Sequence, residues 1–162
     1  TLLLMKAIKK NNYALLLLIN LLLVATIGVI MRYKIGFSFP FLNQKNLQHA
    51  HSHFAFAGWI SQTLMAFMVY YLQQNSTRIS LSKYQTLLTL NLLTSVGMLV
   101  SFIASGYSLV SIVCSTLSIF ISFAFAWLFW VDSKHLPSLS TATKWFKAAL
   151  VFLILSSLAT AF

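Results

Sequence analysis

The sequence predicts an all-α fold, a polytopic bundle of transmembrane helices, and its composition and apolar stretches support this prediction. Hydrophobic residues make up 59% of the 162 residues and charged residues only 7%, with a mean hydropathy of +0.86. A soluble domain carries about 25% charged residues. The chain also contains about five apolar stretches near the length of roughly 20 residues that a helix needs to cross a bilayer. We therefore expect an integral membrane protein whose residues 1–162 form a single transmembrane domain.

The expected spans cover residues 13–31, 47–72, 84–104, 107–131 and 145–162. The segments between them, 33–46, 73–83 and 132–144, are polar or contain residues that favour turns, such as Pro40, Asn43 and Pro137. The pair Ser105-Gly106 predicts a tight break between the third and fourth spans. Because the chain starts at Thr1 and ends inside an apolar stretch, we expect it to be a fragment of a longer polypeptide.

The distribution of lysine and arginine predicts that the N-terminus is cytoplasmic. With that orientation, eight of the 11 basic residues lie inside and three lie outside, as the positive-inside rule requires. The inside set is Lys6, Lys9, Lys10, Arg78, Lys83, Lys134, Lys144 and Lys147, and the outside set is Arg32, Lys34 and Lys45. The net charge of +10 therefore indicates contact with lipid headgroups and not with nucleic acid.

Three of the four histidines, His49, His51 and His53, alternate at the start of the second span. Ionisable groups inside a membrane helix are costly and usually functional, and a neutral imidazole is the commonest metal ligand. Because successive helical residues turn by about 100°, His49 and His53 share a face and His51 points to nearly the opposite side. His49 and His53 could hold one metal ion, or one histidine could be the axial ligand of a heme. Hydrated histidines at headgroup level are the third interpretation.

Other polar or small residues in the apolar stretches favour structural roles. Asn20, Asn91 and Gln62 are expected to form hydrogen bonds between helices, and Gly58 is expected to allow close packing. Met65, Met68 and Met98 are expected to fill the core. The chain has one acidic residue, Asp132, which follows the fourth span, so no expected span offers a carboxylate for proton transfer.

Part of the chain resembles a known family. Phe39-Pro40-Phe41-Leu42, the run from Asn46 to His53, and Gly58-Trp59 resemble the start of helix two in subunit I-like proteins of the heme–copper oxidase and nitric oxide reductase superfamily. The run Leu47-Gln48-His49-Ala50 is similar to the Leu-x-His-x pattern of the nitric oxide reductases and their nearest oxidase relatives. The resemblance covers roughly residues 13–72, and the triple alternation of histidines departs from the family's usual pattern.

The resemblance implies that His49 is the axial ligand of a low-spin heme of b type, or His53 if the register shifts by one turn, with His51 also near the cofactor. It implies that helix two begins at the outer face of a membrane, expected to be a bacterial inner membrane. It also implies that the full-length protein is an oxidoreductase of the terminal oxidase or nitric oxide reductase kind. Such a protein would receive electrons from a cytochrome or quinol donor, assemble with other oxidase subunits and could contain copper. The family's remaining ligands lie on later helices that spans three to five do not supply.

Two hypotheses compete with the interpretation of the chain as a heme-binding subunit. The first is a membrane metal-binding sensor or transporter that uses His49 and His53 as ligands. The second is a structural membrane protein with interfacial histidines and no cofactor.

Overall fold

The computed structural model describes residues 2–76, 79–136 and 141–159, and these residues form helices and no strand. The helices are α1 (Leu2–Gly36), α2 (Gln44–His53), the π-helix η1 (Phe54–Ser61), α3 (Gln62–Asn75), α4 (Leu81–Ser105), α5 (Leu109–Asp132), the short 3-10 helix η2 (Ser133–His135) and α6 (Thr141–Ala159). The predicted all-α class is confirmed for the described residues. Arg78, Pro137 and the last three residues of the fifth expected span lie outside them.

Four helical segments among the described residues are long and apolar enough to cross a membrane: Tyr13–Gly36, Gln44–Asn75, Leu81–Ser105 and Leu109–His135. They correspond to the first four expected spans, and α6 occupies most of the fifth. The first loop is shorter than predicted, because α1 continues to Gly36 and the next helix begins at Gln44. Two contacts explain the extension: the Tyr33 and Phe37 rings stack at 4.7 Å, and Lys34 Nζ donates to the carbonyls of Phe39 and Leu42.

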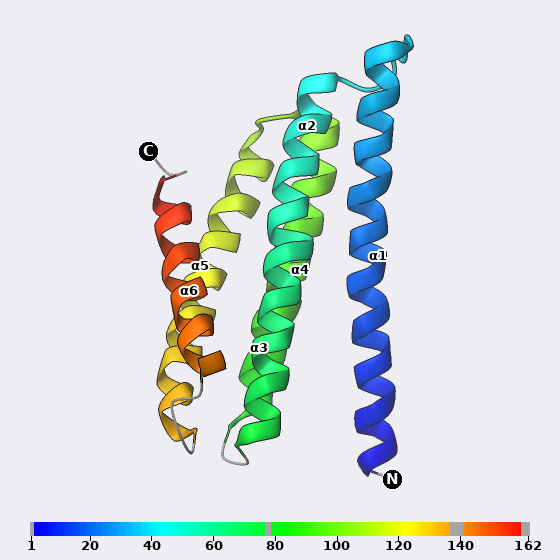
Figure 1. The fold of residues 1–162 in the computed structure, drawn as a ribbon. Coiled ribbons are helices and arrows are strands. Elements are labelled where there is room, and N and C mark those ends of the chain that lie inside the picture. The colour runs from blue at the N-terminus through cyan, green and yellow to red at the C-terminus, as the bar shows by residue number, and fades with distance from the viewer. Residues whose placement is uncertain (1, 77–78, 137–140, 160–162) are drawn as a thin grey trace.

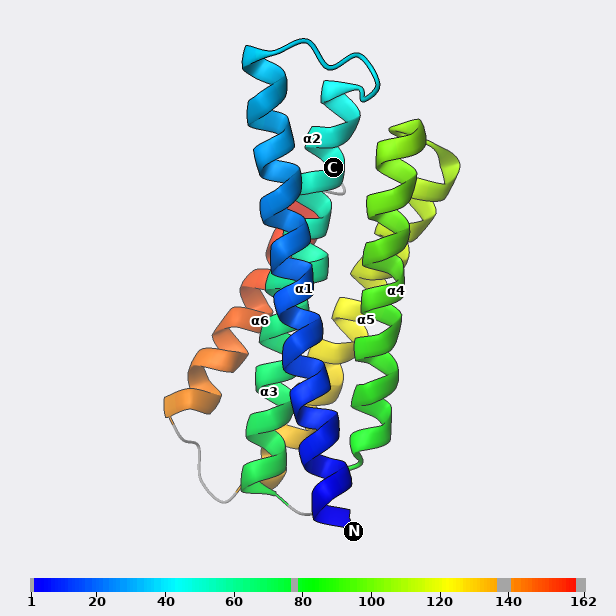
Figure 2. The same ribbon diagram turned by 90° about the vertical axis from the view of Figure 1, so that its right-hand side faces the viewer.

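The long helices alternate in direction, as Figure 1 shows. The connections α1–α2 and α4–α5 lie at one end of the bundle, and the start of α1 lies at the other end, as do the end of α3 and the start of α4 (Figures 1 and 2). The basic residues follow this alternation, with Arg32, Lys34 and Lys45 at the first end and Lys83, Lys134, Lys144 and Lys147 at the second. These basic residues are therefore divided between the two ends of the bundle as the positive-inside prediction requires. The cytoplasmic location of the N-terminus stays a prediction.

Helices α2, η1 and α3 form one continuous rod at the centre of the bundle, flanked by α1 and α4 (Figure 1). Two buried clusters hold this rod in place. The upper cluster joins α1, α2, η1 and α4 through Ile27, Leu47, Ala50, Phe54, Met98, Leu99 and Phe102. The lower cluster joins α3, α4, α5 and α6 through Met65, Met68, Val69, Leu72, Tyr84, Leu88, Phe125, Ala126, Phe129 and Leu150. The expectation that the three methionines fill the core is confirmed, since each is 2% exposed.

The predicted break at Ser105-Gly106 is confirmed, and Gly106 is the residue that makes the turn possible. Its φ is 61° and its ψ is −137°, a combination that side-chain-bearing residues rarely adopt. A Cβ at this position would also lie 2.6 Å from Oδ1 of Asn46, at the start of α2. The turn therefore needs glycine both for its backbone conformation and for its close approach to α2.

Gly106→Ala is expected to lower the free energy of unfolding by about 1–3 kcal/mol, the usual cost of forcing a side chain into such a conformation. Chemical unfolding in detergent micelles measures the effect. Gly36→Ala is the matched control, because a Cβ there would meet nothing within 4 Å and its stability should not fall. Equal stability of the two variants would contradict the assigned role of Gly106.

Candidate functional site

His49 and His53 lie on one face of α2, as the helical spacing predicts, and that face packs against α4. The His53 ring stacks on Phe102, with 4.6 Å between centroids and 10° between planes. The His49 ring lies 6.2 Å from the same Phe102 ring and 4.7 Å, edge to face, from the ring of Tyr107 in the α4–α5 connection. The structure thus brings these two imidazoles together against one aromatic wall, formed by Phe102 and Tyr107.

His51 lies on the other face of α2 and contacts α1, which confirms the predicted separation. Its Cε1 atom is 3.4 Å from the place where a Cβ of Gly28 would stand. Its Nδ1 atom is buried and has no hydrogen-bond partner among the residues that the structure describes. The three histidines therefore form two sites on opposite sides of one helix and not a single cluster.

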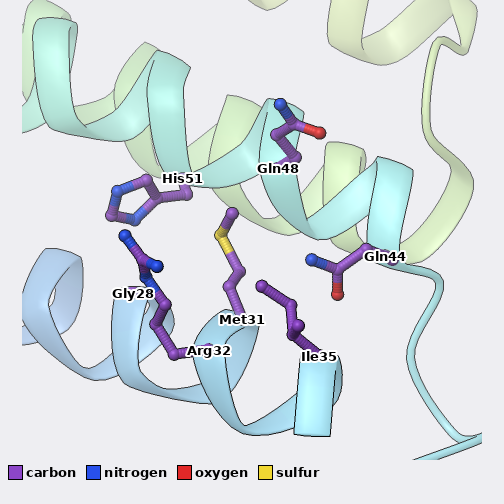
Figure 3. A pocket seen from close by; sticks show the side chains of 7 residues that line it. All are labelled: Gly28, Met31, Arg32, Ile35, Gln44, Gln48 and His51. Carbon is purple, nitrogen blue, oxygen red and sulfur yellow. The ribbon is translucent and has the colours of Figure 1, made fainter.

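The His51 side opens into a pocket of about 400 Å³ between α1 and α2. Figure 3 shows the Arg32 guanidinium beside the His51 ring, Met31 and Ile35 pointing from α1 toward α2, and Gln44 reaching between the helices. Gly28 and Gln48 complete the lining. Volumes of roughly 300–1,000 Å³ are typical of small-molecule sites, so this pocket is large enough for a small group.

The chain changes helix type directly after the histidines. Residues Phe54–Ser61 form the π-helix η1, which starts at the residue after His53. Such segments are rare and frequently mark functional sites. Position 58, near the centre of η1, requires glycine, because a Cβ there would stand 2.6 Å from the Phe54 ring. Its predicted role in close packing is therefore confirmed, with Phe54 as the packed group.

Side chains from neighbouring helices bond to the carbonyl groups of the π-helix. Asn20 Nδ2 on α1 donates to the Gly58 carbonyl at 2.6 Å. Asn91 Nδ2 on α4 donates to the Ala57 carbonyl at 3.0 Å. Backbone groups in lipid need such partners because no water reaches them. The two asparagines thus tie η1 to both flanking helices, as their positions in apolar stretches predict.

A second set of bonds connects the amide of Asn91 to the first residue of α3. Asn91 Nδ2 also donates to Gln62 Oε1 at 2.7 Å, and Gln62 Nε2 donates to the Tyr13 hydroxyl at 2.7 Å and to the Leu88 carbonyl at 2.9 Å. Ser118 on α5 donates to Asn91 Oδ1 at 3.4 Å. Gln62 and Asn91 are fully buried. This amide network, defined by Gln62 and Asn91, joins α1, α3, α4 and α5 near the middle of the histidine-bearing rod.

Other ligand-forming residues in the described part of the chain do not join the histidines in a metal site. Among the described residues, no group of three or more His, Cys, Asp or Glu side chains is arranged to hold a metal ion. Cys114 packs near Gly97 on α4, where a Cβ would stand 2.9 Å from its Sγ atom. Asp132 accepts a hydrogen bond from the Tyr84 hydroxyl at 2.9 Å, at the opposite end of the bundle from the histidines. His135 is exposed in η2 at that same end.

The chain matches no protein-family model, no curated protein and no solved structure.

Proposed function

We propose that the chain is a heme-binding electron-transfer subunit of a membrane oxidoreductase, with an axial ligand supplied by α2. The observation that carries the proposal is the position of the π-helix, which begins immediately after two histidines that share one face. Ionisable residues within a membrane helix indicate function, and a π-helical segment beside them supports the same location. The resemblance to subunit I-like proteins supplies the cofactor class, with His49 or His53 as the ligand.

The residues on this face fit a heme in their donor chemistry. His49 and His53 offer imidazole nitrogens, and Phe102 and Tyr107 offer an apolar aromatic wall. When bound, a heme supplies one-electron transfer at a potential tuned by its axial ligand and surroundings. The chain's own part is to hold the ligand and to exclude water. Because His53 stacks directly on Phe102, binding requires the Phe102 ring to move.

The proposal places the subunit in a lipid bilayer with the histidines toward the outer face, in a bacterial inner membrane. It also includes a cytochrome or quinol as electron donor and other oxidase subunits as partners, with copper in the full-length enzyme. The apolar helices are compatible with contact to lipid. The rest of this environment follows from the resemblance and from the distribution of basic residues.

The test is a reduced-minus-oxidised absorbance spectrum of the purified full-length protein and of His49→Ala and His53→Ala. We expect a b-type signal in the wild-type protein and its loss in one of the two variants, because removal of an axial ligand releases or alters the heme. His135→Ala is the control, since this exposed histidine lies at the other end of the bundle. A folded wild-type protein without heme absorbance would overturn the proposal.

Two other outcomes identify the competing hypotheses. A stoichiometric metal ion without Soret absorbance, lost in both His49→Ala and His53→Ala, would establish a metal-binding protein. Neither heme nor metal, with little effect of either substitution, would leave a structural role for the histidines. Loss of the heme signal in His51→Ala alone would contradict the assignment of the ligand to the α4 face.

A further inference from the structure

Arg32 lacks an acidic partner within this chain. It belongs to the last turns of α1 and lines the α1–α2 pocket. The sequence holds one acidic side chain, Asp132, and this carboxylate is bonded to Tyr84 at the far end of the bundle. Within the described ranges, the Arg32 guanidinium makes no ion pair or side-chain hydrogen bond. Arg32 is exposed near the end of an apolar span, where arginine side chains reach toward the headgroup level, so an anion from outside the chain can pair with it.

His51, which lines the pocket, has a buried ring nitrogen that lacks a partner among the described residues. Nδ1 of His51 is buried and makes no hydrogen bond within the part of the chain that the structure describes. Even a neutral imidazole has one N–H donor, and buried polar groups are nearly always hydrogen-bonded. Figure 3 shows the His51 ring and the Arg32 guanidinium side by side, with the Gln44 amide farther along the same gap. The Arg32 guanidinium and the His51 ring are close enough in this view to face the same anion, and Gln44 offers a further donor along the pocket.

We propose that the α1–α2 pocket binds a phosphate group, supplied by the headgroup of a phospholipid. Arginine forms paired, charge-assisted hydrogen bonds to phosphate oxygens, and His51 and Gln44 add donors from α2. Met31 and Ile35 line the same pocket, so the apolar part of a lipid has a surface to contact. A phosphate that carries lipid chains therefore matches the lining better than a free phosphate ion, which would leave Met31 and Ile35 without an apolar contact.

The depth of the pocket in the bundle agrees with a lipid. Arg32 stands four residues before the end of the apolar segment Tyr13–Gly36. At a rise of 1.5 Å per residue, that is about 6 Å from the end of the span, where lipid phosphates lie and where arginine side chains reach toward the interface. The pocket is therefore at the level at which a headgroup can enter from the bilayer.

The experiment is a titration of the purified full-length protein in detergent with phosphatidylglycerol, in which native mass spectrometry counts the retained lipids. We expect one lipid to be retained by the wild-type protein, and Arg32→Gln to weaken this retention about tenfold, as loss of one charge-assisted contact predicts. His51→Phe keeps an aromatic ring at this position and removes the donor, so it should also weaken lipid retention relative to the wild-type protein. Arg32→Lys keeps the charge without the paired geometry and should fall between wild type and Arg32→Gln.

The matched control is Lys45→Gln, which removes a charge at the same end of the bundle from a residue outside the pocket. Its retention should equal that of the wild-type protein. A second arm adds inorganic phosphate as competitor: no displacement supports a lipid as the source, and complete displacement at equal concentration would assign the site to free phosphate instead. Equal retention by wild type, Arg32→Gln and His51→Phe, all with unchanged helicity, would overturn the proposal. The heme spectrum is measured separately, so either proposal can fail without the other.

Discussion

Asn91→Leu is expected to lower the free energy of unfolding by about 3 kcal/mol. The substitution removes the bonds from Asn91 to Gln62 Oε1 and to the Ala57 carbonyl, and the bond from Ser118 to Asn91 Oδ1. Interhelical hydrogen bonds in membranes contribute about 0.6 kcal/mol on average, and a buried acceptor left without a donor adds about 1–3 kcal/mol. Unfolding of the purified protein in mixed micelles with increasing denaturing detergent measures the change.

Thr89→Ala provides the matched control on the same helix. Thr89 is exposed and its hydroxyl bonds to the Gln85 carbonyl one turn earlier, so its removal should change stability by less than about 0.5 kcal/mol. A double-mutant cycle between Gln62→Leu and Asn91→Leu should show coupling, because the two amides bond directly. Additive effects of the two substitutions, or an Asn91→Leu protein as stable as Thr89→Ala, would contradict the role assigned to this network.

The long helices could be predicted from composition because lipid imposes one dominant requirement, an apolar stretch of sufficient length. Helix ends were harder to predict. Residues 33–36 look like a loop in the sequence, but Lys34 caps the following carbonyls and Tyr33 stacks on Phe37, so α1 continues. The π-helix has no periodic signal in the sequence, and the asparagines that bond to its carbonyls, Asn20 and Asn91, lie on other helices.

The candidate site was predictable only in part, for a similar reason. Helical spacing alone separates His51 from His49 and His53, and the contacts with Gly28 and Phe102 confirm the two faces. Which residues lie opposite those faces depends on how α1 and α4 pack. The sequence predicts only a topological role for Arg32, although its single acidic residue against 11 basic ones already implies that most cations have no acidic partner. Phe102 carries no sequence signal that separates it from the other apolar residues of α4.

Phe102→Ala is expected to lower the free energy of unfolding by about 3 kcal/mol, because large-to-small substitutions of buried aromatic residues usually cost that much. The ring is 1% exposed and contacts His49, His53 and Tyr107. The same substitution should increase the heme content per folded protein, since the ring that stacks on His53 no longer has to move. Chemical unfolding and the heme absorbance of the same samples measure the two effects.

Phe125→Ala separates stability from cofactor binding. Phe125 is as well buried as Phe102 but belongs to the lower cluster, against Tyr84 and Phe129. The two variants should lose similar stability, and only Phe102→Ala should bind more heme. A lower heme content in Phe102→Ala than in Phe125→Ala would mean that the ring supports the cofactor. Lower stability with higher heme content in Phe102→Ala, and lower stability alone in Phe125→Ala, would instead support a cofactor on the α4 face, because only Phe102 stacks on His53.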